Sequence, residues 1–181
     1  MMTVKRQFWV NLVVFLSLML LPLWDASAQE DPFQVFFTPD PATIYVDEAN
    51  AKVVTVDLAN AVNIWSFDVI ITYDSAVAII TDYAITDRFG SVWCAIQTNQ
   101  PGFFQAACAS TGVPVNGDGN LFTLTFTGVG NGKTALTFDR ANFGNTESVR
   151  VPVVSYNGEL NVVGVINLLY LPLIANTEDS G

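Results

Sequence analysis

The sequence predicts an all-β protein in which two sheets pack face to face as a β-sandwich or jelly roll. Three observations lead to this fold class. From residue 33 onward, apolar side chains recur at every second position. β-branched and aromatic residues dominate these runs, and Gly- and Asn-rich turns separate them at short intervals. Eight or nine short strands, each with one apolar face, can bury those faces only against a second sheet.

The longest alternating run is residues 63–73 (NIWSFDVIITY), which we expect to form a central strand. Its predicted inner face consists of alternate apolar residues: Trp65, Phe67, Val69, Ile71 and Tyr73. Further strands are expected at residues 52–58, 121–127, 133–138 and 151–163. The turns between these strands are expected at residues 116–119, 128–132 and 157–158. No window shows sustained helical spacing.

The first 28 residues have the features of a cleavable signal peptide. Lys5 and Arg6 precede an apolar run over residues 8–23, and Ala26-Ser27-Ala28 supplies the small residues of a cleavage site. The apolar run is shorter than the roughly 20 residues of a transmembrane helix, although a retained membrane anchor is the alternative. We therefore expect an exported protein, secreted or at the cell surface, with a domain at residues 29–163 and a tail at residues 164–181.

The charge balance argues against nucleic acid and anionic membranes as partners. Removal of Lys5, Arg6 and Asp25 with the signal peptide leaves five basic and sixteen acidic residues, a net charge of −11. Such a surface repels phosphate groups. The chain has no histidine, so it lacks Ser-His and Cys-His dyads and zinc-histidine sites. We predict a non-enzyme without cofactor or metal, the alternative being two carboxylates that meet in space and hydrolyse glycosides.

The stretch around Asp118, residues 115–120, superficially resembles a calcium loop. Aligning Gly119 with the sixth position of an EF-hand loop places Pro114 at the first position and Thr125 at the last. Neither residue supplies the required carboxylate, so we expect a structural turn there. A looser calcium site built from surface aspartates is the alternative.

Cys94 and Cys108 are predicted to form a disulfide. Residues 91–97 and 103–110 resemble two strands around a turn-rich link at residues 98–102. Folding this hairpin about Pro101 places the two cysteines directly opposite each other, at a separation suited to a disulfide. Export also favours oxidation, and two free buried thiols are the alternative.

The same hairpin contains a candidate aromatic binding patch. If the cysteines face the core, the alternation directs Ile96 inward and Trp93 and Gln97 outward, beside Gln105. An exposed indole flanked by glutamines could stack on a pyranose ring. The candidate glycan site is Trp93, Gln97, Phe103 and Gln105. The alternative is a Trp93 side chain covered by a neighbouring loop, residues 82–90.

A second candidate surface is the polar row of the central strand. It consists of Ser66, Asp68, Ile70 and Thr72, which the alternation directs outward and which could hydrogen-bond to a protein partner. A solvated sheet face is the alternative. The surface could be extended by a threonine-rich row, Thr123, Thr125 and Thr127, although threonines are also simply good strand formers, which is the favoured interpretation.

Three segments in order resemble the cohesin domain family, over about residues 33–163. Residues 64–80 (IWSFDVIITYDSAVAII) resemble the family's aromatic-x-Asp pattern followed by alternating apolar residues and Tyr-Asp. Residues 117–120 (GDGN), followed by LFTLTFTGVGNGKTALTF, resemble its glycine turn and Thr-rich strand. Residues 151–163, which contain Asn157-Gly158, resemble its closing hairpin.

This resemblance implies a nine-stranded jelly roll, shared with cellulose-binding modules, that acts outside the cell without catalysis. Cohesins hold dockerin modules of polysaccharide-degrading enzymes through one sheet face. Asp68 matches an aspartate of that face, and Ser66 stands where asparagine is common. The expected role is therefore non-covalent binding in extracellular polysaccharide degradation, with either a dockerin-like protein module or a polysaccharide as partner.

The C-terminal tail supports a third hypothesis. Residues 162–175 are mostly apolar, and residues 176–181 are polar and acidic. Three features argue against a transmembrane span: the apolar stretch is too short, it contains Pro172, and no basic residues follow it. The apolar stretch is expected either to complete the sheet or to expose residues 170–174 as a docking segment. In the latter case the protein could be a structural cell-surface protein attached through its tail.

Overall fold

The computed structural model describes residues 31–45 and 51–164. The predicted signal peptide and the tail from residue 165 onward lie outside the described residues, so the expectations about them stay predictions. In the described part of the chain no helix is long and apolar enough to cross a membrane.

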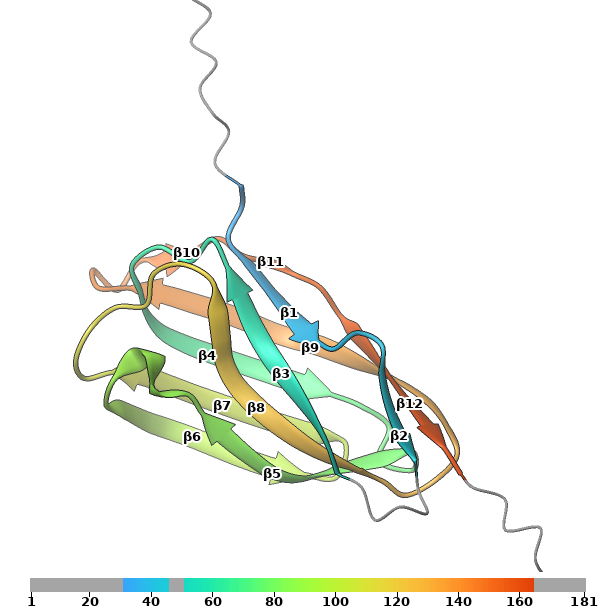
Figure 1. Ribbon diagram of the computed structural model, residues 1–181. Coiled ribbons are helices and arrows are strands. Elements are labelled where there is room, and N and C mark those ends of the chain that lie inside the picture. The colour runs from blue at the N-terminus through green and yellow to red at the C-terminus, as the bar shows by residue number, and fades with distance from the viewer. Residues whose placement is uncertain (1–30, 46–50, 165–181) are drawn as a thin grey trace, which may run out of the picture. The chain divides into compact units, whose positions relative to one another are not determined.

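The predicted all-β sandwich is confirmed: the strands form two sheets that lie face to face (Figure 1). One sheet has the order β11-β1-β3-β8-β5, and the other has the order β2-β12-β9-β4-β7-β6, with β10 added beside β9. The described strands are β1 (Gln34–Thr38), β2 (Ala42–Tyr45), β3 (Ala51–Ala59), β4 (Ile64–Thr72), β5 (Ala78–Ile85), β6 (Val92–Gln100), β7 (Phe103–Ser110), β8 (Gly119–Gly128), β9 (Gly132–Asn145), β10 (Arg150–Val151), β11 (Val154–Ser155) and β12 (Gly158–Val163). A short 3-10 helix, η2 (Asp87–Phe89), precedes β6.

The described residues form twelve strands where nine were expected, because two segments change sheets. Pro39 and Pro41 lie between β1 and β2, and these strands pair in different sheets. Proline has no N–H for a sheet ladder, so it suits such a corner. The closing segment is likewise divided into β10, β11 and β12, with Pro152 directly after β10.

The core is formed by the inward side chains of both sheets. In β4, Phe67, Val69 and Ile71 are buried, while the residues between them are partly exposed, as the alternation predicts. From the opposite sheet, Leu124 and Phe126 of β8 are fully buried. Each such side chain contributes roughly 1.5–3 kcal/mol of transfer free energy.

Polar side chains close one open edge of the sandwich, between the edge strands β5 and β6. The Tyr83 hydroxyl donates to Oε1 of Gln97 at 3.1 Å, and Nδ2 of Asn99 donates to the Ile80 carbonyl at 2.9 Å. These bonds join the two sheets where no backbone ladder connects them.

The predicted disulfide is confirmed, whereas the predicted hairpin register holds for only part of β6. Cys94 and Cys108 are directly opposed and bonded. A β-bulge at Ala95 then shifts the pairing by one residue, and β6 continues to Gln100. The turn is consequently only Pro101-Gly102, where Gly102 has a φ of 79° that glycine adopts readily.

Candidate functional site

The outer faces of β9, β4, β7 and β6 form one continuous surface, which we name the four-strand face. Residues that are paired across strands point to the same side of a sheet, so the pairing defines rows of neighbours. The first row contains Trp93, Ala109, Ser66 and Gly144; the second contains Ile96, Ala107, Asp68 and Asn142. The third contains Thr98, Gln105, Ile70 and Arg140; the fourth contains Gln100, Phe103, Thr72 and Thr137. The two candidate surfaces of the sequence analysis therefore lie on the same face.

Asp68 lies near the centre of this face and is held by two side chains. Nε2 of Gln105 donates to its Oδ1 at 3.0 Å, and the Arg140 guanidinium donates to its Oδ2 at 2.8 Å. Nearby, the Thr72 hydroxyl donates to Oδ1 of Asp139 at 3.2 Å. Arg140 was not predicted as a site residue, because it is 72 positions from Asp68 and no local pattern pairs the two strands. The carboxylate is thus fixed in position and its charge is compensated.

The aromatic patch is present but differs from the expected one in two residues. Trp93 is 64% exposed, so the alternative that a loop covers it is wrong. Ile96, expected inward, is 42% exposed on the four-strand face. Gln97 is paired with the buried Ala106 and bonds to the opposite sheet, so its expected place beside Trp93 is wrong. The bulge at Ala95 causes both differences, since one extra residue reverses the side on which later residues point.

Trp65 also lies on the outer side rather than in the core. The pairing of β4 with β9 shifts between Ile64 and Ser66, which leaves Trp65 as the additional residue of a second bulge. Ile64 is fully buried, and Trp65 is partly exposed. The expectation that Trp65 shares the inner face with Phe67 is therefore wrong.

A shallow hollow, which we name the Gly144 hollow, lies at the Trp65 end of the four-strand face. Its volume is about 370 Å³, and its lining includes Trp65, Ser66, Asp68, Asn142, Gly144, Asn145, Ser148 and Arg150. The missing side chain of Gly144 makes room, because a Cβ there would lie 2.7 Å from the Ser66 hydroxyl. Phe67 and Phe143 also line the hollow, so its lining combines polar side chains with aromatic ones.

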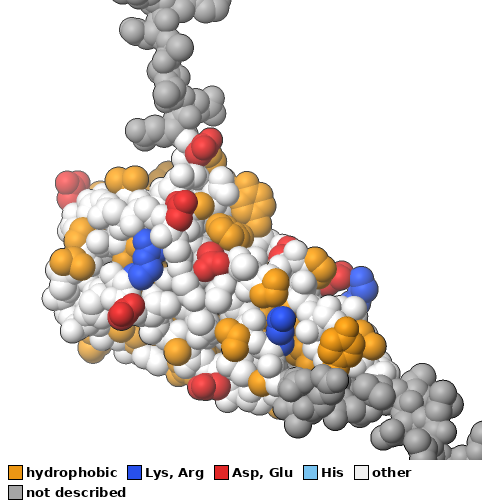
Figure 2. Space-filling model, in the orientation of Figure 1, with side chains coloured by type: hydrophobic (Ala, Val, Ile, Leu, Met, Phe, Trp, Pro, Cys, Tyr) orange, Lys and Arg blue, Asp and Glu red, His pale blue; other side chains and the backbone are white. Residues whose placement is uncertain are grey.

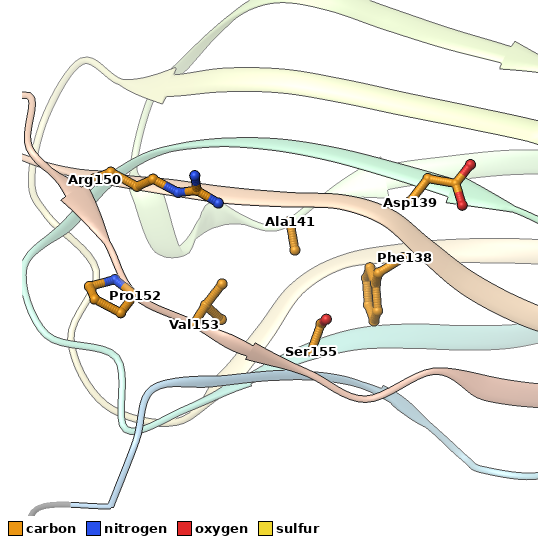
Figure 3. Close-up of a pocket in the computed structure, with 7 residues that line it drawn as sticks. All are labelled: Phe138, Asp139, Ala141, Arg150, Pro152, Val153 and Ser155. Carbon is orange, nitrogen blue, oxygen red and sulfur yellow. The ribbon is translucent and has the colours of Figure 1, made fainter.

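A second hollow of about 520 Å³ lies beside β9 (Figure 3). β12 pairs with β9 up to Leu136, and β10 pairs only from Phe143 onward, so neither strand covers the stretch between. Arg150 and Phe138 lie on opposite sides of this opening. Arg150 lines both hollows.

The threonine-rich row of β8 does not extend the four-strand face. Thr123 and Thr125 pair with β3 and β5 in the other sheet, and Thr127 follows the same alternation. Figure 2, which views the molecule from the side of the five-stranded sheet, shows few charged side chains, scattered among hydrophobic ones. The alternative that these threonines extend the four-strand face is therefore wrong.

The Asp118 loop is a structural turn in the described residues. Oδ1 of Asp118 accepts a hydrogen bond from the Asn60 N–H at 2.8 Å, and the Gly117 N–H donates to the Ala61 carbonyl at 2.7 Å. Within residues 31–45 and 51–164, no three Asp, Glu or Cys side chains are grouped closely enough to hold a metal ion. The predicted lack of a cofactor stays a prediction.

The comparisons with known proteins identify the fold. No family model matches the chain, and no curated protein sequence matches it. Among solved structures, a non-cellulosomal cohesin from the archaeon Archaeoglobus fulgidus aligns with a TM-score of 0.61 and 19% identity, covering 74% of this chain and 92% of that one. The sixth cohesin of scaffoldin B from Acetivibrio cellulolyticus, solved with a Cel5 dockerin, has a TM-score of 0.62 and 16% identity, covering 74% and 100%.

A third similar structure is the cohesin module of a family 33 glycoside hydrolase from Clostridium perfringens, with a TM-score of 0.60, 13% identity and coverage of 74% and 97%. The fold and the four-strand face define a two-sheet β-sandwich module with one broad, partly apolar sheet surface. Its fold is the cohesin fold, and the resemblance drawn from the sequence is confirmed at this level.

Proposed function

We propose that the protein is a non-catalytic extracellular binding module that holds a dockerin-like protein module on its four-strand face. The observation that carries this proposal is the position of Asp68. Its carboxylate is fixed by Gln105 and Arg140 at the centre of a face that also exposes Trp93 and Ile96. Protein-binding surfaces combine an apolar, aromatic-rich area with polar groups around it, and this face offers both in the Trp93 and Ile96 side chains beside Asp68.

The small residues of β7 allow a partner to approach closely. Ala107 and Ala109 lie between the apolar side chains of β6 and the polar row of β4. Because these alanine side chains are short, the Trp93 indole projects beyond them. A side chain of the partner can therefore pack against the indole. Exposed tryptophans in such positions often dominate binding energy. Because the Asp68 side chain is already held in place, it loses little conformational entropy when a partner binds.

Two further observations support the proposal. Several of the similar structures are cohesins in complex with dockerins, among them one from Clostridium thermocellum with 14% identity and a TM-score of 0.61. The Cys94–Cys108 disulfide is compatible with an oxidising extracellular compartment. The predicted signal peptide is consistent with the same location.

Asp68→Ala is expected to weaken partner binding at least tenfold while leaving stability nearly unchanged. The partner would lose a fixed acceptor, whereas a partly exposed ion pair contributes about 1 kcal/mol or less to folding. Calorimetric titration against a panel of purified dockerin modules measures the first effect, and thermal unfolding measures the second. Thr125→Ala, on the other sheet, is the matched control and should bind as the wild type does. Equal loss in both variants would count against the four-strand face.

Extracellular polysaccharide is the second candidate partner, favoured by the exposure of Trp93. Without Gln97, the candidate patch on the four-strand face consists of Trp93, Phe103 and Gln105. Retention on insoluble cellulose, xylan or chitin that is lost in Trp93→Ala but kept in Asp68→Ala would favour this candidate. If the protein is retained on none of these polysaccharides, the hypothesis of a polysaccharide partner is wrong. The hypothesis of a structural cell-surface protein rests on the tail outside the described residues and stays a prediction.

A further inference from the structure

We propose that the Gly144 hollow is a glycan-binding subsite that takes a single pyranose unit. This inference goes beyond the proposed protein recognition, although the hollow shares Ser66 and Asp68 with the surface used for it. It also differs from the Trp93 patch, because the neighbours of Trp93 on β6 and β7 in these rows are Ala109, Ala107 and Ile96. Such surroundings provide few hydrogen bonds for sugar hydroxyls.

The wall of the hollow is an ordered turn. The Asn145 N–H donates to the Val149 carbonyl at 3.0 Å, and the Ser148 N–H donates to the Asn145 carbonyl at 3.0 Å. Oδ1 of Asn145 accepts from the N–H groups of Glu147 and Val149, both at 2.9 Å. Both the backbone and the Asn145 side chain are therefore fixed before any ligand arrives, which lowers the ordering cost of binding.

The polar lining offers donors and acceptors that the fold itself does not use. Ser66, Asn142 and Ser148 line the hollow, and their side chains form no hydrogen bond to another described residue. Arg150 takes part in neither of the two ion pairs of the described residues, Lys133–Glu159 and Arg140–Asp68. The hollow is thus lined by hydroxyl- and amide-bearing residues together with Arg150 and the charge-compensated Asp68.

This composition fits a pyranose better than an ion or an apolar ligand. Each sugar hydroxyl both donates and accepts, and the lining supplies both kinds of partner. The bulge that turns Trp65 outward adds an indole, which can cover the apolar face of a sugar ring. A volume of about 370 Å³ is within the range of small-ligand sites. Because Arg140 compensates Asp68, the site does not require a cation.

The test is a titration of the purified protein with cellohexaose, xylohexaose, chitohexaose and a hexagalacturonate, followed by calorimetry and by backbone amide shifts. We expect binding of at least one of them, with the largest shifts at Asn142, Gly144 and Ser148. Preference for the uronate would indicate that Arg150 contacts its carboxylate, whereas preference for a neutral sugar would assign the contacts to hydroxyls. Either preference supports the subsite.

Gly144→Ala should reduce this affinity at least tenfold, because the new Cβ displaces the Ser66 hydroxyl and raises the floor of the hollow. Ser148→Ala, in the turn, provides a second variant if Gly144→Ala does not fold. Trp93→Ala should bind the sugar as the wild type does while weakening a dockerin partner, so the two proposals can fail separately. Absence of binding at millimolar sugar would overturn the subsite. Binding that is lost in Trp93→Ala but kept in Gly144→Ala would also overturn it.

Discussion

Phe104→Ala is expected to lower the free energy of unfolding by about 3–5 kcal/mol. Phe104 is fully buried on the inner side of β7, with ring centroids 5.2 Å from Tyr83 and 5.4 Å from Phe122. Removing the ring leaves a cavity between the two sheets and ends both aromatic contacts. This loss is a large fraction of the 5–15 kcal/mol that stabilises a typical domain.

Urea unfolding followed by circular dichroism measures this loss. Phe103→Ala is the matched control, because Phe103 is the preceding residue of the same strand but points to the partly exposed outer face. Phe103→Ala is expected to lower the free energy of unfolding by only about 1 kcal/mol, because less of the Phe103 side chain is buried. A similar cost for the two variants would contradict the assignment of inner and outer faces in β7. If Phe104→Ala is unfolded in buffer, its stability can be compared in a stabilising osmolyte.

Removal of the disulfide is expected to lower the free energy of unfolding by about 3 kcal/mol, which is the second-largest expected effect. The bond closes a loop with a sequence separation of 14 residues, and closing a loop of this size restricts the unfolded chain by roughly that free energy. The double variant Cys94→Ala/Cys108→Ala, compared with the oxidised protein in thermal and urea unfolding, measures the effect. A reductant should lower the stability of the wild type toward that of the variant and leave the variant unchanged. Equal stability of variant and oxidised wild type would show that the bond does not constrain unfolding.

The same double variant should also bind its partner less tightly. β6 is an edge strand that pairs with β7 alone in its sheet, and it carries Trp93 next to Cys94. Without the covalent link, the end of β6 that carries Trp93 is held by fewer constraints. Part of the binding energy would then be spent on ordering this strand.

Local patterns were sufficient to predict most of the longer strands and the buried face of β4 from Phe67 onward. The alternation of Phe67, Val69 and Ile71 defines the inner face of β4, and the outward row from Ser66 to Thr72 follows directly. The disulfide was also predictable, because Cys94 and Cys108 belong to one hairpin. These features depend on neighbours that are close in sequence.

The bulges and the combined site were not predictable in this way. A bulge inserts one residue relative to the partner strand, so the outward turn of Trp65 and Ile96 depends on pairing and not on composition. Asp68 and Arg140 meet because β4 lies beside β9, a neighbour distant in sequence. The Gly144 hollow has the same origin, since residues 65–68 of β4 line it together with residues of β9 and of the turn that follows β9.

The central claim is that the four-strand face is the recognition surface. Hydroxyl-radical footprinting of the protein, alone and in complex with a dockerin module that it binds, tests this most directly. The expected result is a loss of oxidation at Trp93 and Phe103, with unchanged oxidation at Val53 of β3 and at Tyr156, which are about half exposed. Protection of Val53 or Tyr156 with undiminished oxidation of Trp93 would contradict it, and so would failure to bind any dockerin module.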